Sequence, residues 1–138
     1  MSGDLEELYQ SIILDHNRRP QNFRAMPEAT AHAEGMNPMC GDQLTVWLKM
    51  HGDVVEDISF QGTGCAISKA SASLMTAAVK GKTRDEVAKL FESFHGLVTG
   101  KGGGETVGGL KAFSGVSRFP LRVKCATLAW HALNSALK

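Results

Sequence analysis

Three cysteines and one aspartate are the residues of this chain whose types could together bind a metal ion or carry sulfur chemistry. Cys40 and Asp42 are two residues apart in the stretch 35–42, Gly-Met-Asn-Pro-Met-Cys-Gly-Asp. We predict that this stretch is neither helix nor strand, because Pro38 fixes its own φ and Gly41 permits a tight bend. Such a bend would point the thiol of Cys40 and the carboxylate of Asp42 at one spot.

The other two cysteines stand beside predicted helices. Cys65 is followed at once by the alanine-rich segment 66–79, which favours a helix. The unpaired N–H groups and the dipole at a helix N-terminus favour a thiolate, so this position suits a chemically active cysteine. Cys125 lies in a last helix that is predicted to begin near Pro120, since proline fits the first helical turn. Arg122 is three residues before Cys125, so both can share one helix face.

Two interpretations of the cysteines remain open at this point. If the three thiols converge with Asp42, three sulfurs and one oxygen form a tetrahedral set suited to Zn²⁺. Thiolates also suit iron–sulfur chemistry, and Arg122 and Lys124 would offset the negative charge that such a site retains. In the alternative interpretation the cysteines are buried and act as small apolar residues. The spacing does not decide, because no Cys-x-x-Cys pair occurs.

Other motifs that carry chemistry do not match. The glycine-rich residues 100–109 are not a phosphate loop, because Gly102 stands where Ser or Thr would be needed after Gly-Lys. We expect a mobile lid or a plain insertion there. The chain has neither the Gly-x-Ser-x-Gly nor the His-Glu-x-x-His hydrolase motif. None of the histidines has a recognisable ligand spacing to a cysteine, so we predict surface or structural roles for His16, His32, His51, His95 and His131.

The periodicity of apolar residues predicts the elements that position these groups. A helix is expected before Pro20, because apolar residues recur at its i, i+3, i+4 and i+7 positions. A short strand is expected over 30–34. Apolar and polar residues alternate over 44–51 and 54–61, so that Ile58 and Phe60 lie on one face of the strand and Asp57 and Ser59 on the other. This alternation predicts an antiparallel hairpin with one buried face. Further helical segments are expected over 66–79, after a capping box at Thr83 and Glu86, over 110–114 and from Pro120 onward.

Length and composition indicate one globular domain spanning residues 1–138. The chain is 43% hydrophobic and 21% charged, and its net charge of +1 argues against a protein built mainly to bind nucleic acid. The first seven residues lack the basic and then apolar pattern of a signal peptide. No apolar run approaches the ~18 residues of a membrane span. We therefore expect a cytoplasmic protein, whose thiols stay reduced.

Three motifs follow one another along the chain: Met-Asn-Pro-Met-Cys-Gly-Asp at 36–42, Phe-Gln-Gly-Thr-Gly-Cys-Ala-Ile-Ser at 60–68 and Arg-Val-Lys-Cys-Ala-Thr-Leu-Ala-Trp at 122–130. Together they resemble the U-type proteins of iron–sulfur cluster biogenesis, the IscU, SufU and NifU N-terminal family. The resemblance is closer to the SufU branch. Lys124 stands where the Isc branch has a histidine, and the interval between Cys65 and Cys125 is longer than in the Isc pattern.

The resemblance implies an α+β fold, a three-stranded antiparallel sheet with helices packed on one face and the metal site at one end. It also implies that Cys40, Asp42, Cys65 and Cys125 are metal ligands, with Zn²⁺ bound at rest. Cys40 would accept persulfide sulfur from a pyridoxal-phosphate-dependent cysteine desulfurase, which would make the protein a zinc-dependent sulfurtransferase.

Two further functions remain as alternatives to sulfur transfer. In the first, the same ligands hold a transient [2Fe–2S] cluster that is assembled on this scaffold and handed to apo-proteins. In the second, from a different class, the site is a structural zinc module that binds a partner and does no sulfur chemistry.

Overall fold

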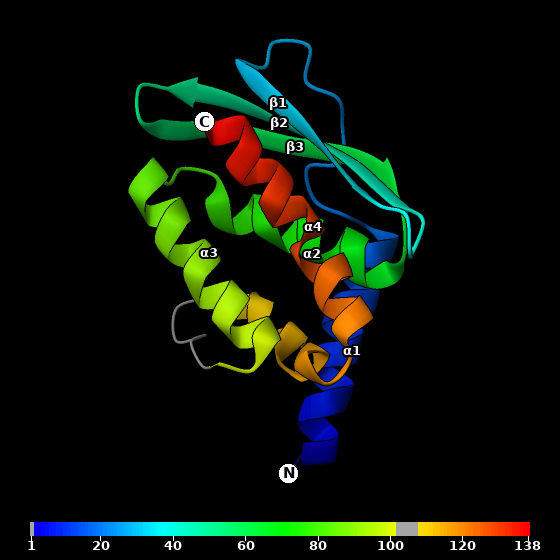
Figure 1. The fold of residues 1–138 in the computed structure, drawn as a ribbon. Coiled ribbons are helices and arrows are strands. Elements are labelled where there is room, and N and C mark those ends of the chain that lie inside the picture. Colours follow the sequence, from blue (N-terminus) through cyan, green and yellow to red (C-terminus); the bar gives the residue numbers. More distant parts are fainter. Residues whose placement is uncertain (1, 102–107) are drawn as a thin grey trace.

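A three-stranded antiparallel sheet forms one layer of the protein, and helices pack against one of its faces (Figure 1). The computed structural model describes residues 2–101 and 108–138. The predicted α+β class is confirmed. The elements are α1 (Ser2–Arg18), β1 (Ala31–Asn37), β2 (Asp42–His51), β3 (Val54–Thr63), α2 (Ala66–Val79), α3 (Arg84–Thr99), the 3₁₀ helix η1 (Gly108–Arg118) and α4 (Pro120–Leu137).

The sheet has the order β1-β2-β3, and its first turn differs from the prediction. β1 reaches Asn37 instead of ending at residue 34, and Asn37 pairs with Asp42 at the start of β2. The prediction that all of 35–42 is irregular was therefore wrong, and only residues 38–41 form the turn. Pro38 lies in the turn itself, so its missing N–H interrupts no pairing between the strands. The two ligand candidates Cys40 and Asp42 thus lie at the tip of a paired hairpin.

The predicted hairpin of β2 and β3 is confirmed, and its pairing contains one register shift. Lys49 pairs with Asp57 but Met50 pairs with Val55, which leaves Glu56 as an extra residue on β3. Because one extra residue reverses the alternation of faces, Val55 and Ile58 both point into the core. Leu44, Val46 and Leu48 of β2 are buried against the helices, as their spacing predicts.

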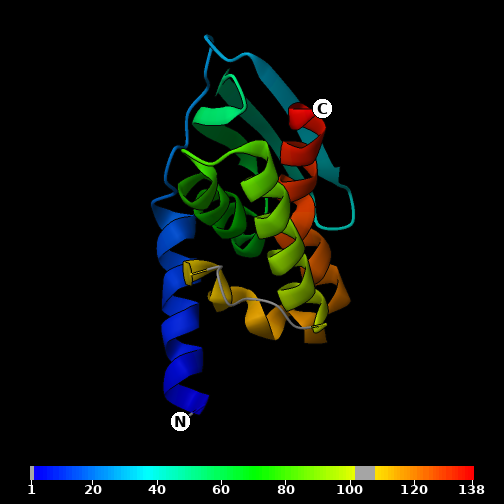
Figure 2. The same cartoon turned by 90° about the vertical axis from the view of Figure 1, so that its left-hand side faces the viewer.

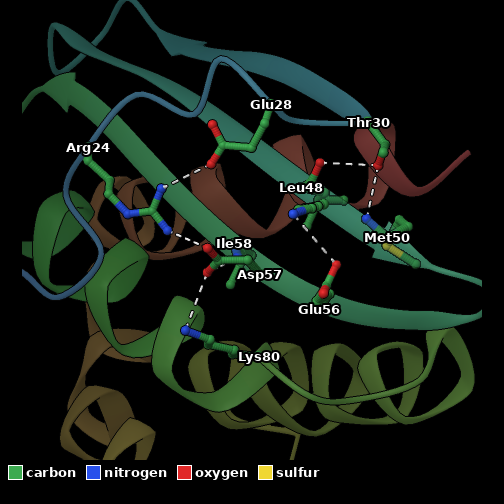
Figure 3. Close-up of polar contacts among 10 residues, drawn as sticks. Arg24, Glu28, Thr30, Leu48, Met50, Glu56, Asp57, Ile58 and Lys80 are labelled. Carbon is green, nitrogen blue, oxygen red and sulfur yellow. Dashed lines mark hydrogen bonds and ion pairs between the residues drawn. The ribbon is translucent and has the colours of Figure 1, made fainter.

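The second face of the sheet is partly covered by the segment that joins α1 to β1 (Figure 3). Arg24 in this segment forms ion pairs with Asp57 and with Glu28, and Lys80 reaches the same Asp57 carboxylate at 3.4 Å. Residues on alternate positions of a strand share a face, so Ser59 lies on the side of the sheet that this segment covers. Ser59 is consequently buried, although the alternation predicted an exposed position.

The helices follow the predicted signals closely. α2 covers 66–79 with Cys65 as its N-cap, and α3 begins with the capping box of Thr83 and Glu86. Pro120 occupies the first turn of α4. The predicted helical piece at 110–114 belongs to the longer η1, which crosses between α1 and α3 (Figure 2). Residues 102–107 of the predicted glycine-rich loop lie outside the described residues. No described helix has the length and hydropathy of a membrane span.

A buried stack of aromatic side chains fixes α4 against its neighbours. The Trp130 ring lies parallel to Phe94 of α3, with 4.9 Å between centroids. The Trp130 indole N–H donates to Ser71 Oγ of α2 at 3.2 Å, and that hydroxyl donates to the carbonyl of Ala126 at 2.5 Å. These contacts tie α2 and α4 together one residue away from Cys125.

Polar contacts join α1 to α2. Ser73 Oγ lies 2.7 Å from His16 Nδ1 and accepts a hydrogen bond from the Gln21 backbone N–H at 2.8 Å. Burial lowers the pKa of His16, and the nearby Asp15 carboxylate opposes this effect only in part. The native structure therefore favours the neutral imidazole at this helix contact.

This histidine predicts a pH dependence of stability. A histidine whose pKa is lowered on folding binds a proton more readily in the unfolded chain, so its contribution to the free energy of unfolding declines as the pH falls through the ordinary value of about 6.5. We expect wild type to lose more stability than His16→Gln between pH 7.5 and pH 5, as measured by urea unfolding. All other groups are common to both chains, so their contributions cancel in the difference. Parallel pH profiles would contradict this assignment.

Candidate metal centre

The tip of the β1–β2 hairpin carries the first two predicted ligands. The Cys40 backbone N–H donates to the carbonyl of Asn37 at 3.2 Å and closes the turn. Gly41 has φ of +70°, a left-handed conformation that glycine adopts without strain. Cys40 is half-buried in this turn, whereas Asp42 is 0% exposed. The hairpin thus places one partly exposed cysteine beside one fully buried carboxylate.

Asp42 is bonded to the start of α2. Its Oδ1 accepts a hydrogen bond from the Cys65 backbone N–H at 2.8 Å, and its Oδ2 lies 3.9 Å from Cys65 Sγ. The Cys65 sulfur in turn accepts from the Ser68 N–H at 3.5 Å, as expected for a cysteine at a helix N-terminus. A Cβ at Gly64 would lie 2.5 Å from Asp42 Oδ1, so only glycine permits this approach.

Cys125 of α4 completes the cluster from the opposite side. Ligand atoms of Cys40, Asp42 and Cys125 all lie within 4.8 Å of one another. Cys125 is 2% exposed, and the Asn37 side-chain amide donates to its sulfur at 3.8 Å. Burial, followed by contacts with Asp42, Cys40 and Cys65, raises the pKa of the Cys125 thiol. A thiolate at this position is therefore disfavoured unless a cation lies beside it.

The chemistry of these donors fits a thiophilic metal ion. In the described part of the chain no Lys, Arg or His side chain forms an ion pair with the buried Asp42 carboxylate. A buried charge without a partner is costly, and a divalent ion among thiolates would compensate it. Cys65 is outside the tightest group of three, but its sulfur contacts Asp42 and can supply the fourth donor. Sulfur-rich sets of four donors suit Zn²⁺ or iron–sulfur clusters.

The two predicted supporting cations lie on the surface. Arg122 and Lys124 are exposed, and the Arg122 guanidinium lies over the Phe119 ring, 4.5 Å from its centroid. Their role in offsetting the charge of the site stays a prediction. Sequence reasoning missed the amide of Asn37 as a partner of Cys125, because no local pattern links two residues 88 positions apart.

The comparisons with known proteins agree on one family. The NifU-like N-terminal domain profile matches residues 8–138. The zinc-dependent sulfurtransferase SufU of Bacillus subtilis is 39% identical over 99% of this chain and 93% of its own length. The iron–sulfur cluster assembly scaffold protein IscU of Streptococcus pyogenes is 40% identical over 97% of this chain and 85% of its own.

A solved structure shows the same fold. An iron–sulfur cluster assembly scaffold protein for the SUF system from Fervidobacterium islandicum superposes with a TM-score of 0.87 at 35% identity. The match covers 92% of this chain and 94% of that protein.

The close approach of Asp42 to the backbone of Gly64 predicts that adding one methyl group at Gly64 weakens metal binding. In Gly64→Ala the new Cβ would collide with Asp42 Oδ1, so the carboxylate must leave the Cys65 amide. Because groups that orient ligands matter to metal binding, we expect zinc affinity to fall by about 10- to 100-fold in competition with a chromophoric chelator. Gly115→Ala is the matched control, since a Cβ there meets nothing within 4 Å. Equal affinities of the two variants would refute this role of Gly64.

Proposed function

The chain belongs to the family of NifU-like N-terminal domains, and from this premise we propose that it accepts sulfur from a cysteine desulfurase at a centre formed by Cys40, Asp42, Cys65 and Cys125, with Zn²⁺ bound at rest. It is an iron–sulfur cluster assembly protein of the IscU and SufU type. The observation that carries the proposal is the cluster of Cys40, Asp42 and Cys125 ligand atoms, in a chain 39% identical to a zinc-dependent sulfurtransferase.

Its place on a turn, together with its greater exposure than Cys125, supports Cys40 as the acceptor. Cys40 lies on a turn and is half-buried, whereas Cys125 is buried within a helix. A turn residue can move out of the centre at a smaller cost than a residue on a packed helix. A partner's sulfur therefore reaches Cys40 more readily than Cys125.

The proposed reaction is a thiol–persulfide exchange. The Cys40 thiolate attacks the outer sulfur of a persulfide on the desulfurase, a new S–S bond forms, and the bond to the desulfurase sulfur breaks. The desulfurase leaves as a thiolate and Cys40 carries the persulfide, so no external oxidant or reductant is needed. A bound Zn²⁺ would keep the thiols deprotonated and protect them between transfers. Asp42, Cys65 and Cys125 would hold the ion while the desulfurase supplies a donor in place of Cys40.

The same residues support a second candidate function. IscU of Streptococcus pyogenes, 40% identical to this chain, is a cluster assembly scaffold. The four donors would then hold a [2Fe–2S] cluster as cargo for downstream apo-proteins. A purely structural zinc module remains the alternative from another class. We place all three functions in the cytoplasm, where thiols stay reduced.

Replacement of the acceptor separates these functions. We expect wild type to stimulate the turnover of a pyridoxal-phosphate-dependent cysteine desulfurase and Cys40→Ser to abolish the stimulation, because serine is a much weaker nucleophile toward a persulfide. Zinc content and the unfolding midpoint are measured on the same samples. Cys125→Ser is the comparison variant, because it removes a buried ligand and should lower both zinc content and stability.

Each of the three functions predicts a different combination of desulfurase stimulation, visible absorbance and fold stability. Stimulation that is lost in Cys40→Ser while the fold persists supports sulfur transfer. A stable visible absorbance after anaerobic loading with iron and sulfide, without stimulation, would favour the scaffold instead. Loss of fold stability in Cys40→Ser with no stimulation by wild type would leave only the structural module.

A further inference from the structure

Asn37 contacts the metal centre through both its backbone and its side chain. It is the last residue of β1 and is 7% exposed. Its carbonyl accepts the hydrogen bond from the Cys40 N–H, and its side-chain Nδ2 lies 3.8 Å from Cys125 Sγ. It also faces Asp42 across the hairpin. One residue of the β1–β2 hairpin thus touches three of the four predicted ligand residues.

The three cysteine sulfurs differ in whether they accept a hydrogen bond from an N–H group. Cys65 Sγ accepts from the Ser68 N–H and Cys125 Sγ accepts from the Asn37 amide. Among the described residues, no N–H group donates to Cys40 Sγ. The two sulfurs on helices each have a donor, and the sulfur on the turn has none.

This difference has a chemical consequence. A thiolate has no proton to donate, so a side-chain amide beside it is favourable only with its N–H directed at the sulfur. A hydrogen bond of this kind stabilises negative charge on sulfur and lowers its nucleophilicity. Cys125 is thereby suited to remain a ligand, and Cys40 keeps its electron density for attack on a persulfide.

We propose that Asn37 is a positioning residue whose amide holds Cys125 as a permanent ligand and so directs incoming sulfur to Cys40. The first part concerns metal binding alone, and the second rests on the proposed sulfur transfer. Groups that hydrogen bond to metal ligands orient them and tune the bound ion, which is the role that the geometry gives to Asn37.

The metal-binding part is tested with Co²⁺ and Zn²⁺ on Asn37→Ala and Asn37→Asp. Loss of the donor raises the energy of the sulfur lone pairs, so the sulfur-to-Co²⁺ charge-transfer band should move to longer wavelength in Asn37→Ala. Zinc affinity should fall by about 10- to 100-fold in Asn37→Ala and further in Asn37→Asp, whose carboxylate repels the thiolate. A merely structural role would leave the position of the band unchanged.

The control is Asn134→Ala, which makes the same substitution on α4 in the wall of a separate cavity of about 460 Å³. Far-UV circular dichroism and metal-free unfolding confirm that each variant folds. Asn37→Ser, whose side chain is too short to bond the sulfur, replaces the alanine variant if that chain does not fold. An unmoved band together with wild-type zinc affinity in the folded variants would overturn the proposal.

Mass spectrometry then identifies which cysteine carries the persulfide, which tests the directing role of Asn37. After reaction with a cysteine desulfurase, wild type should carry the added sulfur on Cys40, and Asn37→Ala should carry part of it on Cys125. Sulfur confined to Cys40 in both chains would overturn the directing role. If neither chain acquires sulfur, the proposed transfer function fails, and a shifted cobalt band would still establish the hydrogen bond to Cys125.

Discussion

The hydrogen bond from the Cys65 backbone amide to the buried Asp42 carboxylate is the constraint on which the metal centre depends. It joins the first residue of β2 to the N-cap of α2, so the sheet and the helix layer meet at this bond. The approach is so close that the backbone at Gly64 has no room for a side chain. The carboxylate held this way is fully buried, and none of the described Lys, Arg or His side chains forms an ion pair with it. A metal ion bound there would compensate the negative charge of the carboxylate.

Contacts between the helices α2 and α4 position Cys125 on the other side of the centre. Ser71 accepts the indole N–H of Trp130 and donates to the carbonyl of Ala126, which sets the position of α4 relative to α2. Since Cys125 directly precedes Ala126, its sulfur is fixed by the same contacts that close the core. Cys40 instead lies on the turn between β1 and β2, where its N–H donates to the carbonyl of Asn37. The fold thus places Cys125 in a packed helix and Cys40 on a turn.

Structural features that depend on a few neighbouring residues could be predicted from the sequence. The capping box at Thr83 and the proline that begins α4 could be predicted, because a few neighbouring residues determine a helix end. The extension of β1 to Asn37 could not, since glycine, asparagine and proline favour a turn and only pairing with β2 overrides that preference. From residue types and spacing alone, convergence of the cysteines is one of two interpretations, and the resemblance to a family is what favours it. Spacing along the chain does not report contacts between distant residues.

The unequal surroundings of the three sulfurs would allow one site both to hold a metal ion and to exchange a ligand. If all the thiols were equally buried and hydrogen bonded, release of any one would disturb a packed helix, and exchange would compete with unfolding. Here Cys40, the proposed acceptor, is on a turn, while Cys65 caps α2, Cys125 lies within α4, and both of their sulfurs accept N–H donors. Loss of Cys40 from the centre would leave two sulfurs and Asp42 in place. The proposed sulfur transfer and the alternative scaffold function would both use this asymmetry, since each requires one ligand to leave while the others stay bound.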